Sequence, residues 1–482
     1  MSGLQCSKLL WNKTHAKDQL PPIDPETQAI FDQGHVVTVW AQKLYPNGIE
    51  IIGDPEDYDS LFKQTELALK KGKPLFEAAF TYKNAFARPD ILSPNADGSW
   101  DLLEVKSSTE VKDVNLHDVA FQVYCYEGAG LKIRKANLVL INNEYVRKGA
   151  IDVNALFHVE DLTAKIRPMV SRVESNIESM LQTLDLKDDP KVQIGRHCLE
   201  PYDCPLVERC WSFLPKAHVL TLNRLIPKER GFKWIYSGIQ KIVDIPATEK
   251  LTDKHIIQRE CARTGTPYQD KEAIKGFLDS VKFPVYLVDF ETCTSAVPLY
   301  DDSRAYQQIP FQFSILTWES WDAEPKHTSF LWREMTDPRA EFIKALKDEL
   351  GDKGSILAYN FSFEKGRIKD IVELMPQYKE WWSATEGRFQ DLLTPFSKFH
   401  YYHPNQEGSA SIKAVYPAMV GGSYEGLAIA DGAAASREYT RFVNGGMPKE
   451  EAQKLFDALE VYCSLDTKAM YDLMKALKSI SN

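Results

Sequence analysis

The stretch WDLLEVKSST, residues 100–109, has the alternating pattern of a β-strand and places two opposite charges near its end. Side chains at positions i and i+2 of a strand point to the same side, so Glu104 and Lys106 are expected to be neighbours. Such a pair most often belongs to a solvated sheet edge. The residues on either side of the stretch decide whether the pair has a chemical role.

The residues before this stretch predict a hairpin. Residues 79–108 contain two strand-like segments joined by a turn rich in Pro, Asn, Asp and Gly, with Asp90 on the incoming strand and Glu104 on the outgoing one. The hairpin can bring both carboxylates to one divalent cation, and hard oxygen ligands suit Mg²⁺ or Mn²⁺. Lys106 would then lie beside the attacking water and the phosphate. Whether Glu77 also points into this site is open.

A helix is expected after the strand, over residues 115–130. Gln122 and Tyr126 are four residues apart in this helix and therefore lie on one face. Both side chains can hydrogen-bond to a phosphate or hold Glu104 and Lys106 in place.

Together these residues resemble the PD-(D/E)xK nuclease superfamily, in particular its RecB-like branch. The residues that carry the resemblance are Gly34, His35, Asp90, Glu104, Lys106, Gln122 and Tyr126. It implies a restriction-endonuclease-like core whose metal is bound by Asp90, Glu104 and His35, with Lys106, Gln122 and Tyr126 as further catalytic residues. A lone histidine at a helix start is usually structural, but the Gly-His step before an apolar helix matches the family's metal-binding histidine.

Eight cysteines in a chain without a secretory signal do not predict a disulfide framework. The sequence is similar to a subgroup of RecB-like proteins, the CRISPR-associated RecB-like exonucleases and the AddB nuclease domain, with one cysteine before the nuclease core and three after it. The matching residues are Cys6, Cys198, Cys204 and Cys210. The resemblance implies that they hold a 4Fe-4S cluster joining the two ends of the domain, although four thiolates suit zinc equally well by charge and number. The other cysteines are expected to be buried small side chains, namely Cys125, Cys261, Cys293 and Cys463.

A second group of acids begins in residues 283–295, FPVYLVDFETCTS, where an apolar strand ends in Asp289 and Glu291. These carboxylates share a strand face and repel each other, which is tolerable mainly when a cation lies between them. Later segments contribute further polar residues, namely Asn360, Glu364, Asp391, Tyr462 and Asp466. Tyr462 and Asp466 are four apart on an expected helix and share a face.

In order, these residues resemble the DnaQ-like, or DEDD, 3′-5′ exonuclease family. The resemblance implies a ribonuclease-H-like fold and hydrolysis with two metal ions. It implies that the metal ligands are Asp289, Glu291 and Asp466, and that Tyr462 orients the attacking water. The third acid is Glu364 where the family has aspartate, and Asp391 is a reserve candidate.

The chain is predicted to be a multidomain α/β protein. Its 482 residues exceed one typical domain of about 100–200 residues, and its hydrophobic (44%) and charged (26%) fractions are those of a folded globular chain. The predicted parts are a RecB-like nuclease domain over residues 1–230, a helical connector over 231–275 and a DnaQ-like exonuclease domain over 276–482. This pairing resembles an uncharacterised conserved bacterial family that joins the two modules. The connector is either purely structural or similar to helix-hairpin-helix modules that grip the DNA backbone.

Charge and hydropathy limit the function classes. The net charge of −10 argues against a surface that coats nucleic acid, but it leaves room for a local basic groove. Residues 209–241 contain seven Lys or Arg and one acid, which suits either a phosphate-contacting patch or a solvated helix face. No signal peptide is recognised, and no apolar run approaches the about 18 residues of a membrane span, so a cytoplasmic chain without membrane contact is expected.

The function expected from both resemblances is a divalent-metal-dependent nuclease with two active sites. DNA is favoured over RNA because both families cut DNA most often, and single-stranded DNA or DNA ends would suit both sites. DNA repair, defence against foreign DNA and processing of DNA fragments are all open. The alternatives are a nucleic-acid-binding protein with one or both sites inactive, for which Glu364 is the argument, and an RNA-directed exonuclease.

Overall fold

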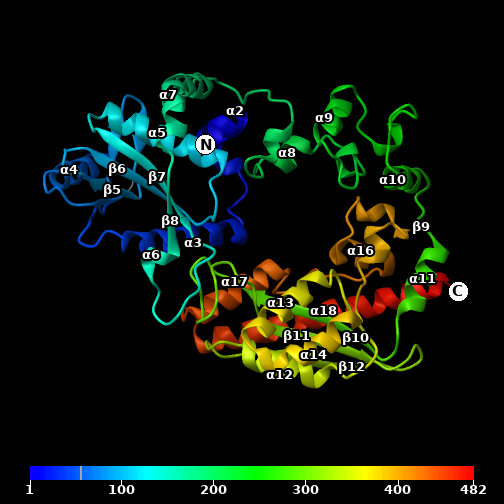
Figure 1. Cartoon of the computed structure of the whole chain (residues 1–482). Helices are drawn as coiled ribbons and strands as arrows, with labels where there is room; N and C mark the ends of the chain where they lie inside the picture. Colours follow the sequence, from blue (N-terminus) through cyan, green and yellow to red (C-terminus); the bar gives the residue numbers. More distant parts are fainter. Residues whose placement is uncertain (55–56, 482) are drawn as a thin grey trace. The chain divides into compact units, whose positions relative to one another are not determined.

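A computed structural model describes residues 1–54 and 57–481 of the chain. The residues fall into two compact units (Figure 1). The first consists of Met1–Trp211 and Ser295–Gln307, and the second of Ser212–Thr294 and Gln308–Asn482. Each unit contains its own β-sheet and helices, so the chain is a multidomain protein of mixed α/β class, as the sequence predicts.

The units differ from the three expected parts in three places. The first expected part ends at residue 230, but residues 212–230 belong to the second unit. Residues 231–275 do not form a separate connector, because they belong to the second unit as well. Within it, β9 (Tyr268–Gln269) pairs antiparallel with β15 (Tyr401–Tyr402). The third difference is Ser295–Gln307, which follows β10 (Val285–Cys293) in sequence but belongs to the first unit. Contacts between residues so far apart in sequence leave no signal in local patterns.

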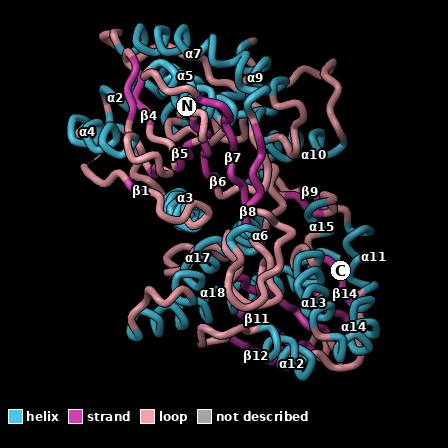
Figure 2. The backbone as a smooth tube through the Cα atoms, turned by 60° about the vertical axis from the view of Figure 1, so that its left-hand side comes forward, coloured by secondary structure: helices cyan, strands magenta, loops and turns pink. Residues whose placement is uncertain are grey.

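A mixed six-stranded sheet organises the first unit (Figure 2). Its strands, in spatial order, are β1 (Ile49–Glu50), β2 (Leu75–Phe76), β5 (Ile91–Pro94), β6 (Trp100–Lys106), β7 (Ile133–Ile141) and β8 (Phe157–Asp161). The expected hairpin is the antiparallel pair β5–β6, in which Ile91 lies opposite Leu103. A second small hairpin precedes it, formed by β3 (Phe80–Tyr82) and β4 (Ala85–Ala87).

The first unit also contains helices, several of which pack directly on this sheet. The helices of this unit are α1 (Ser2–Gln5), α2 (Ser7–His15), α3 (Pro25–Gln42), α4 (Tyr58–Leu69), α5 (Asp113–Gly128), α6 (Val153–Leu156), α7 (Thr163–Leu184) and α8 (Val207–Trp211), with 3-10 turns η1 (Lys17–Gln19) and η2 (Arg196–Cys198). Because β6 and β7 are parallel, the chain must cross over between them, and α5 makes that crossover. Val119 and Val123 of α5 share a buried core cluster with Leu102 and Leu138 of the sheet.

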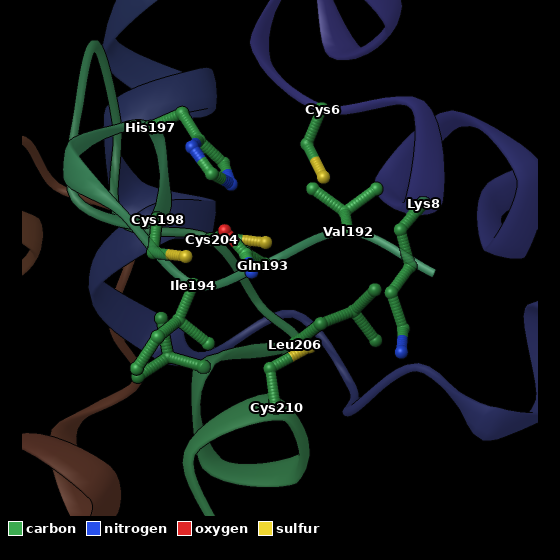
Figure 3. Close-up of a pocket in the computed structure, with 11 residues that line it drawn as sticks. Cys6, Lys8, Val192, Gln193, Ile194, His197, Cys198, Cys204, Leu206 and Cys210 are labelled. Carbon is green, nitrogen blue, oxygen red and sulfur yellow. The ribbon is translucent and has the colours of Figure 1, made fainter. Parts of the chain in front are cut away.

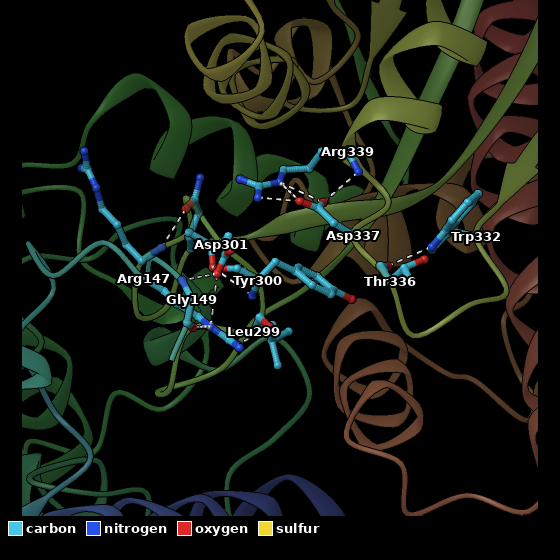
Figure 4. Close-up of polar contacts among 12 residues, drawn as sticks. Arg147, Gly149, Leu299, Tyr300, Asp301, Trp332, Thr336, Asp337 and Arg339 are labelled. Atoms are coloured by element: carbon cyan, nitrogen blue, oxygen red, sulfur yellow. Dashed lines mark hydrogen bonds and ion pairs between the residues drawn. The ribbon is translucent and has the colours of Figure 1, made fainter. Parts of the chain in front are cut away.

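The segment Ser295–Gln307 is fastened to the first unit by polar contacts (Figure 4). The Arg147 guanidinium donates to the carbonyl of Leu299 at 2.7 Å, and the backbone N–H of Gly149 donates to Asp301 Oδ1 at 2.8 Å. Ala296 and Ala305 of the segment are buried in the same apolar cluster as Val37 of α3. The segment is therefore an integral part of this unit.

A five-stranded mixed sheet organises the second unit. Its strands, in spatial order, are β12 (Lys326–Leu331), β11 (Ile309–Trp318), β10, β13 (Ser355–Ala358) and β14 (Phe389–Asp391). The central strand β10 is antiparallel to β11 and parallel to β13. It is almost entirely buried, as its continuous apolar run predicts.

Helices pack on both faces of β10. The helices of this unit are α9 (Glu229–Tyr236), α10 (Asp253–Thr264), α11 (Lys271–Ser280), α12 (Arg339–Glu349), α13 (Ser362–Leu374), α14 (Lys379–Thr385), α15 (Thr394–Ser397), α16 (Ile412–Val420), α17 (Gly432–Val443) and α18 (Lys449–Ser481). Its 3-10 turns are η3 (Val219–Thr221), η4 (Ile242–Asp244), η5 (Pro376–Tyr378), η6 (Glu386–Arg388) and η7 (Pro404–Gln406). Leu287 clusters with Leu473 of α18, whereas Val288 clusters with Phe342 of α12. Alternate side chains of β10 therefore face different helix layers, and Asp289 lies on the α18 side.

None of the helices in the described part of the chain is both long enough and apolar enough to cross a bilayer.

Candidate functional site

Glu104 is the centre of a buried polar cluster in the first unit. It lies on β6 with 7% of its surface exposed. Its Oε1 accepts a hydrogen bond from Lys106 Nζ at 2.6 Å, and its Oε2 accepts one from Gln122 Nε2 at 2.7 Å. The structure therefore brings together the strand pair and the helix glutamine that the sequence singles out.

Asp90 approaches the same cluster from the neighbouring strand. It directly precedes β5, and its Oδ2 accepts the backbone N–H of Val105 at 2.7 Å. Burial raises the pKa of Glu104, and the charge of Asp90 raises it further. Burial likewise raises the pKa of Asp90. Two such carboxyl groups need a proton or a cation to neutralise them, so this pair can hold a metal ion.

Asp118 completes the cluster and was not among the predicted residues. Its Oδ2 accepts a hydrogen bond from Lys106 Nζ at 2.8 Å. Burial alone would lower the pKa of Lys106, but Glu104 and Asp118 together raise it, so the ammonium group stays charged. A signal was available in the sequence, because Asp118 lies four residues before Gln122 on the same helix face.

Tyr126 is placed differently from Gln122. The ring is fully buried, and its hydroxyl group has no hydrogen-bond partner among the described residues. Its ring packs edge-on against Phe80, with the ring centroids 4.9 Å apart. Burial raises the pKa of Asp90, and the charge of Glu77 raises it further; the carboxylate of Glu77 itself lies 3.5 Å from Arg88 Nε.

The sequence predicts that His35 lies at the start of a helix, and this prediction is wrong. The helix α3 begins at Pro25, after Asp24 whose side chain caps it by accepting the N–H of Thr27, so His35 lies inside the helix and is exposed. The residue of α3 that approaches the acids is Thr38, one turn later, whose Oγ1 lies 3.4 Å from Asp90 Oδ1. Among the described residues, no hydrogen bond or ion pair joins His35 to Asp90.

A second cluster of acids surrounds a cavity in the second unit. The cavity of about 520 Å³ is lined by all five residues predicted for this site: Asp289, Glu291, Glu364, Tyr462 and Asp466. Burial raises the pKa of Asp289, and the charges of Asp466 and Glu291 raise it further. The acids come from β10, α13 and α18, so only the tertiary fold brings them together.

Glu364 is the most isolated of these acids. Only 3% of its surface is exposed, and its Oε2 has no hydrogen-bond partner within the described residues. Burial raises its pKa to about 8, and the charge of Asp391 adds to the effect. Asp391 itself holds the backbone beside the cavity, because its Oδ1 accepts the N–H of Asn360 at 2.9 Å and so fixes that residue at a φ of +74°.

Two residues near the second site were not predicted. The Tyr424 hydroxyl group donates to Asp466 Oδ1 at 2.7 Å. The ammonium group of Lys413 lies 5.6 Å from the ring centroid of Tyr462, and its charge lowers the pKa of Glu291 against the effect of burial. Both residues lie between β15 and α17 in sequence, where no periodic pattern points to a site.

The four predicted cysteines line one pocket in the first unit (Figure 3). We call this group the cysteine cage; it consists of Cys6, Cys198, Cys204 and Cys210, all of them free thiols. Burial raises the pKa of Cys204, and the three other thiols of the cage act in the same direction. Gln5 fastens the N-terminal segment beside the cage, because its Nε2 donates to the carbonyl of His197 at 2.9 Å.

In metal-free protein, Glu364→Gln is expected to weaken the pH dependence of stability. The pKa of Glu364 is raised from 4.5 to about 8 in the folded state, so its contribution is full below 4.5 and is lost as the pH rises through about 8. The slope from one such group is at most about 1.4 kcal/mol per pH unit. Urea unfolding in a chelator at about pH 5 and about pH 9 measures it. Glu373→Gln, an exposed acid on the same helix, is the control, and an equal pH dependence in both variants would contradict the prediction.

Comparisons with known proteins attach no activity to these sites. A family model described as "Domain of unknown function (DUF2779)" matches residues 286–411, which include α13 and all of β10 except its first residue. The chain is 26% identical over 266 residues to a protein of Mycoplasma pneumoniae described as "Uncharacterized protein MG366 homolog". That similarity covers 50% of this chain and 39% of the relative's length. No solved structure matches the chain. The DUF2779 similarity thus includes the acids of β10 and α13 but ends before Asp466.

Proposed function

We propose that the chain is a divalent-metal-dependent nuclease with two active sites, one in each unit. The observation that carries the proposal is the cavity of the second unit, which is lined by the five residues that the sequence selected from three distant segments. Four of them are acids whose pKa values burial raises. Buried acids without a cation or proton would cost stability, so a metal site is the function that explains why they are gathered there.

In the proposed second site, Asp289, Glu291 and Asp466 hold the metal, and Glu364 is the further acid. Tyr462 lines the same cavity, and its proposed role is to orient the attacking water. Tyr424 fixes the rotamer of Asp466 through its hydrogen bond. This arrangement supports a DnaQ-like exonuclease with a ribonuclease-H-like core.

In the proposed first site, Asp90 and Glu104 hold the metal and Lys106 contacts the phosphate. Lys106 is held between Glu104 and Asp118 and remains charged, so it can stabilise negative charge that develops on the phosphate. Gln122 orients Glu104. The hairpin β5–β6 and the helix α5 that present these residues support a RecB-like PD-(D/E)xK core.

Both donor sets fit a hard divalent cation. Carboxylate oxygens are the ligands that Mg²⁺ and Mn²⁺ prefer. When bound, such an ion supplies charge stabilisation to the phosphate and makes water a better nucleophile. The cavity of about 520 Å³ falls within the about 300–1,000 Å³ of small-ligand sites, and we propose that it receives one terminal nucleotide. DNA, single-stranded or at its ends, is the substrate that the family resemblances favour, with RNA as the alternative.

We also propose that the cysteine cage holds a 4Fe-4S cluster. Four thiolates suit zinc equally well by charge and number. The resemblance to the RecB-like proteins with four cysteines is what favours the cluster over a single zinc ion.

The test is cleavage of 5′- and 3′-labelled DNA and RNA, single-stranded and duplex, with Mg²⁺ or Mn²⁺. The variants are Asp90→Asn, Asp466→Asn and the double variant. Each single variant is expected to lose one product pattern by at least about 100-fold, as removing one charge-stabilising group does, and the double variant is expected to be inactive.

Matched controls exist in both units. Asp97→Asn changes an exposed acid in the turn of the same hairpin, and Asp457→Asn changes an exposed acid on the same helix α18. Both controls should cleave like the wild type. If the wild type cuts no substrate with either metal but binds DNA, the protein is a nucleic-acid-binding protein with inactive sites, and the nuclease proposal fails.

A further inference from the structure

Cys463 lies beside carboxylates of the second site. It is fully buried on α18, and its Sγ lies 3.5 Å from Asp289 Oδ2. Ligand atoms of Asp289, Glu291 and Cys463 all lie within 4.8 Å of one another. In sequence, Cys463 stands three residues before Asp466, so the helix turns both side chains toward β10.

One distance within this group matches that of a small tetrahedral metal site. Zinc binds thiolate at about 2.3 Å and carboxylate at about 2.0–2.2 Å, which places the sulfur and oxygen about 3.5 Å apart at a tetrahedral angle. The distance between Cys463 Sγ and Asp289 Oδ2 is 3.5 Å. Both carboxylates also line the cavity, so a fourth position can remain open to water or substrate.

A hydrogen bond from the thiol to Asp289 is the simpler explanation of that contact. It explains the pair, but it does not explain why Glu291, an acid with 5% exposure, brings a carboxylate oxygen into the same 4.8 Å group. Two carboxylates and a buried thiol gathered on one side of a strand have the composition of a ligand set. Thiolate selects softer metals, whereas Mg²⁺ prefers oxygen ligands alone.

We propose that Asp289, Glu291 and Cys463 form a binding site for a thiophilic divalent cation of the Zn²⁺ class. Binding releases the thiol proton to solvent and changes no oxidation state. The regulatory consequence rests on the proposed nuclease function: because Asp289 and Glu291 also serve the catalytic metal, Zn²⁺ and Mg²⁺ compete, and Zn²⁺ inhibits the second site.

The binding test uses Co²⁺ as a spectroscopic probe of the full-length protein. Wild type is expected to show thiolate-to-cobalt charge-transfer absorption that Zn²⁺ displaces, and Cys463→Ser is expected to lose the part of that absorption that belongs to this site. Cys293→Ser is the matched control, because Cys293 is equally buried on β10 but donates to the carbonyl of Ile309. The cysteine cage contributes the same Co²⁺ absorption to all three proteins. Its contribution therefore cancels when the spectrum of each variant is subtracted from that of the wild type.

The same proteins are then titrated with Zn²⁺. Cys463→Ser should weaken the Zn²⁺ affinity of this site by at least about 10-fold. Substituting a residue that only hydrogen-bonds to a metal ligand already costs about 10-fold, so removing a ligand should cost no less. Glu291→Gln is a second variant in case the serine variant fails to fold. Unchanged absorption and affinity in both variants would overturn the proposal and leave Cys463 as a hydrogen-bond donor.

Cleavage assays separate this inference from the proposed function. All three proteins carry Asp90→Asn, so that only the second site acts, and the ratio of cleavage with and without Zn²⁺ is compared within each protein at fixed Mg²⁺. The inhibition should be strong in the Asp90→Asn parent and with Cys293→Ser, and weaker with Cys463→Ser. If no protein cleaves DNA but Cys463→Ser still loses the cobalt signal, the nuclease proposal fails while the metal site stands. Equal inhibition of all three proteins would contradict the competition.

Discussion

Replacing Glu104 with glutamine is expected to abolish cleavage by the first unit without destabilising it. The carboxylate accepts hydrogen bonds from Lys106 and Gln122 and is proposed to bind the metal. An amide is a much weaker ligand for a hard cation, so the rate should fall by at least about 100-fold. The measurement is the initial cleavage rate in an Asp466→Asn background, where only the first site can act.

The expected absence of a stability cost follows from the surroundings of Glu104. Burial raises the pKa of this carboxyl group more than Lys106 lowers it, so a neutral side chain of the same shape is tolerated, and Lys106 keeps Asp118 as its charged partner. The Gln122 carbonyl oxygen has no hydrogen-bond partner among the described residues. In the Glu104→Gln variant, the Gln122 amide can turn by 180°. Its oxygen then accepts a hydrogen bond from the side-chain amide at position 104, so the hydrogen bond between the two buried side chains is kept.

Two measurements judge this prediction. The melting temperature of Glu104→Gln in a chelator should equal or exceed that of the wild type. Asp118→Asn is the matched control: it neutralises the other acid that contacts Lys106, but it removes no proposed metal ligand, so its rate loss should be smaller. A Glu104→Gln variant that cleaves at nearly the wild-type rate would exclude a metal-binding role for this residue. A melting temperature lower by more than about 4 °C would mean that the lost rate reflects folding.

The main strands of both units could be predicted because their sequences are dominated by local patterns. β10 is a continuous apolar run, and β6 alternates before its charged end. The i, i+2 rule for strands and the i, i+4 rule for helices then select side chains that share a face. These rules suffice for Glu104 with Lys106, and they would also have found Asp118.

Other features depend on packing between distant segments, and local rules do not reach them. The Gly-His step predicts a helix start near His35, but α3 already begins at Pro25, after the capping residue Asp24. As a result, Thr38 and not His35 is the residue of α3 that lies beside Asp90. Tyr424 is positioned by tertiary structure, not by a periodic pattern. The segment Ser295–Gln307 joins the first unit because its alanines are buried there.

Substitution of Cys204 by serine is expected to release the cofactor of the cysteine cage and to destabilise the first unit. The cage connects Cys6 near the N-terminus with residues 198–210, so a bound cofactor closes almost the whole first unit into one loop. A covalent cross-link that closes a loop of this length contributes about 2–5 kcal/mol, and loss of one ligand should cost a similar amount. Protein purified without oxygen is compared by iron, sulfide and zinc content and by chelator-free thermal unfolding.

The control for the cage is Cys261→Ser, which changes a buried cysteine of the second unit. It should keep the wild-type metal content, because Cys261 contacts the carbonyl of Tyr402 and not the cage. Four iron and four sulfide per chain, lost only in Cys204→Ser, would establish a 4Fe-4S cluster, whereas one zinc per chain that is lost only in Cys204→Ser would establish the smaller site. If wild type binds neither metal and Cys204→Ser melts at the same temperature, the cage is a group of buried thiols. In that case the ends of the first unit are joined by packing and by polar contacts such as the hydrogen bonds of Gln5.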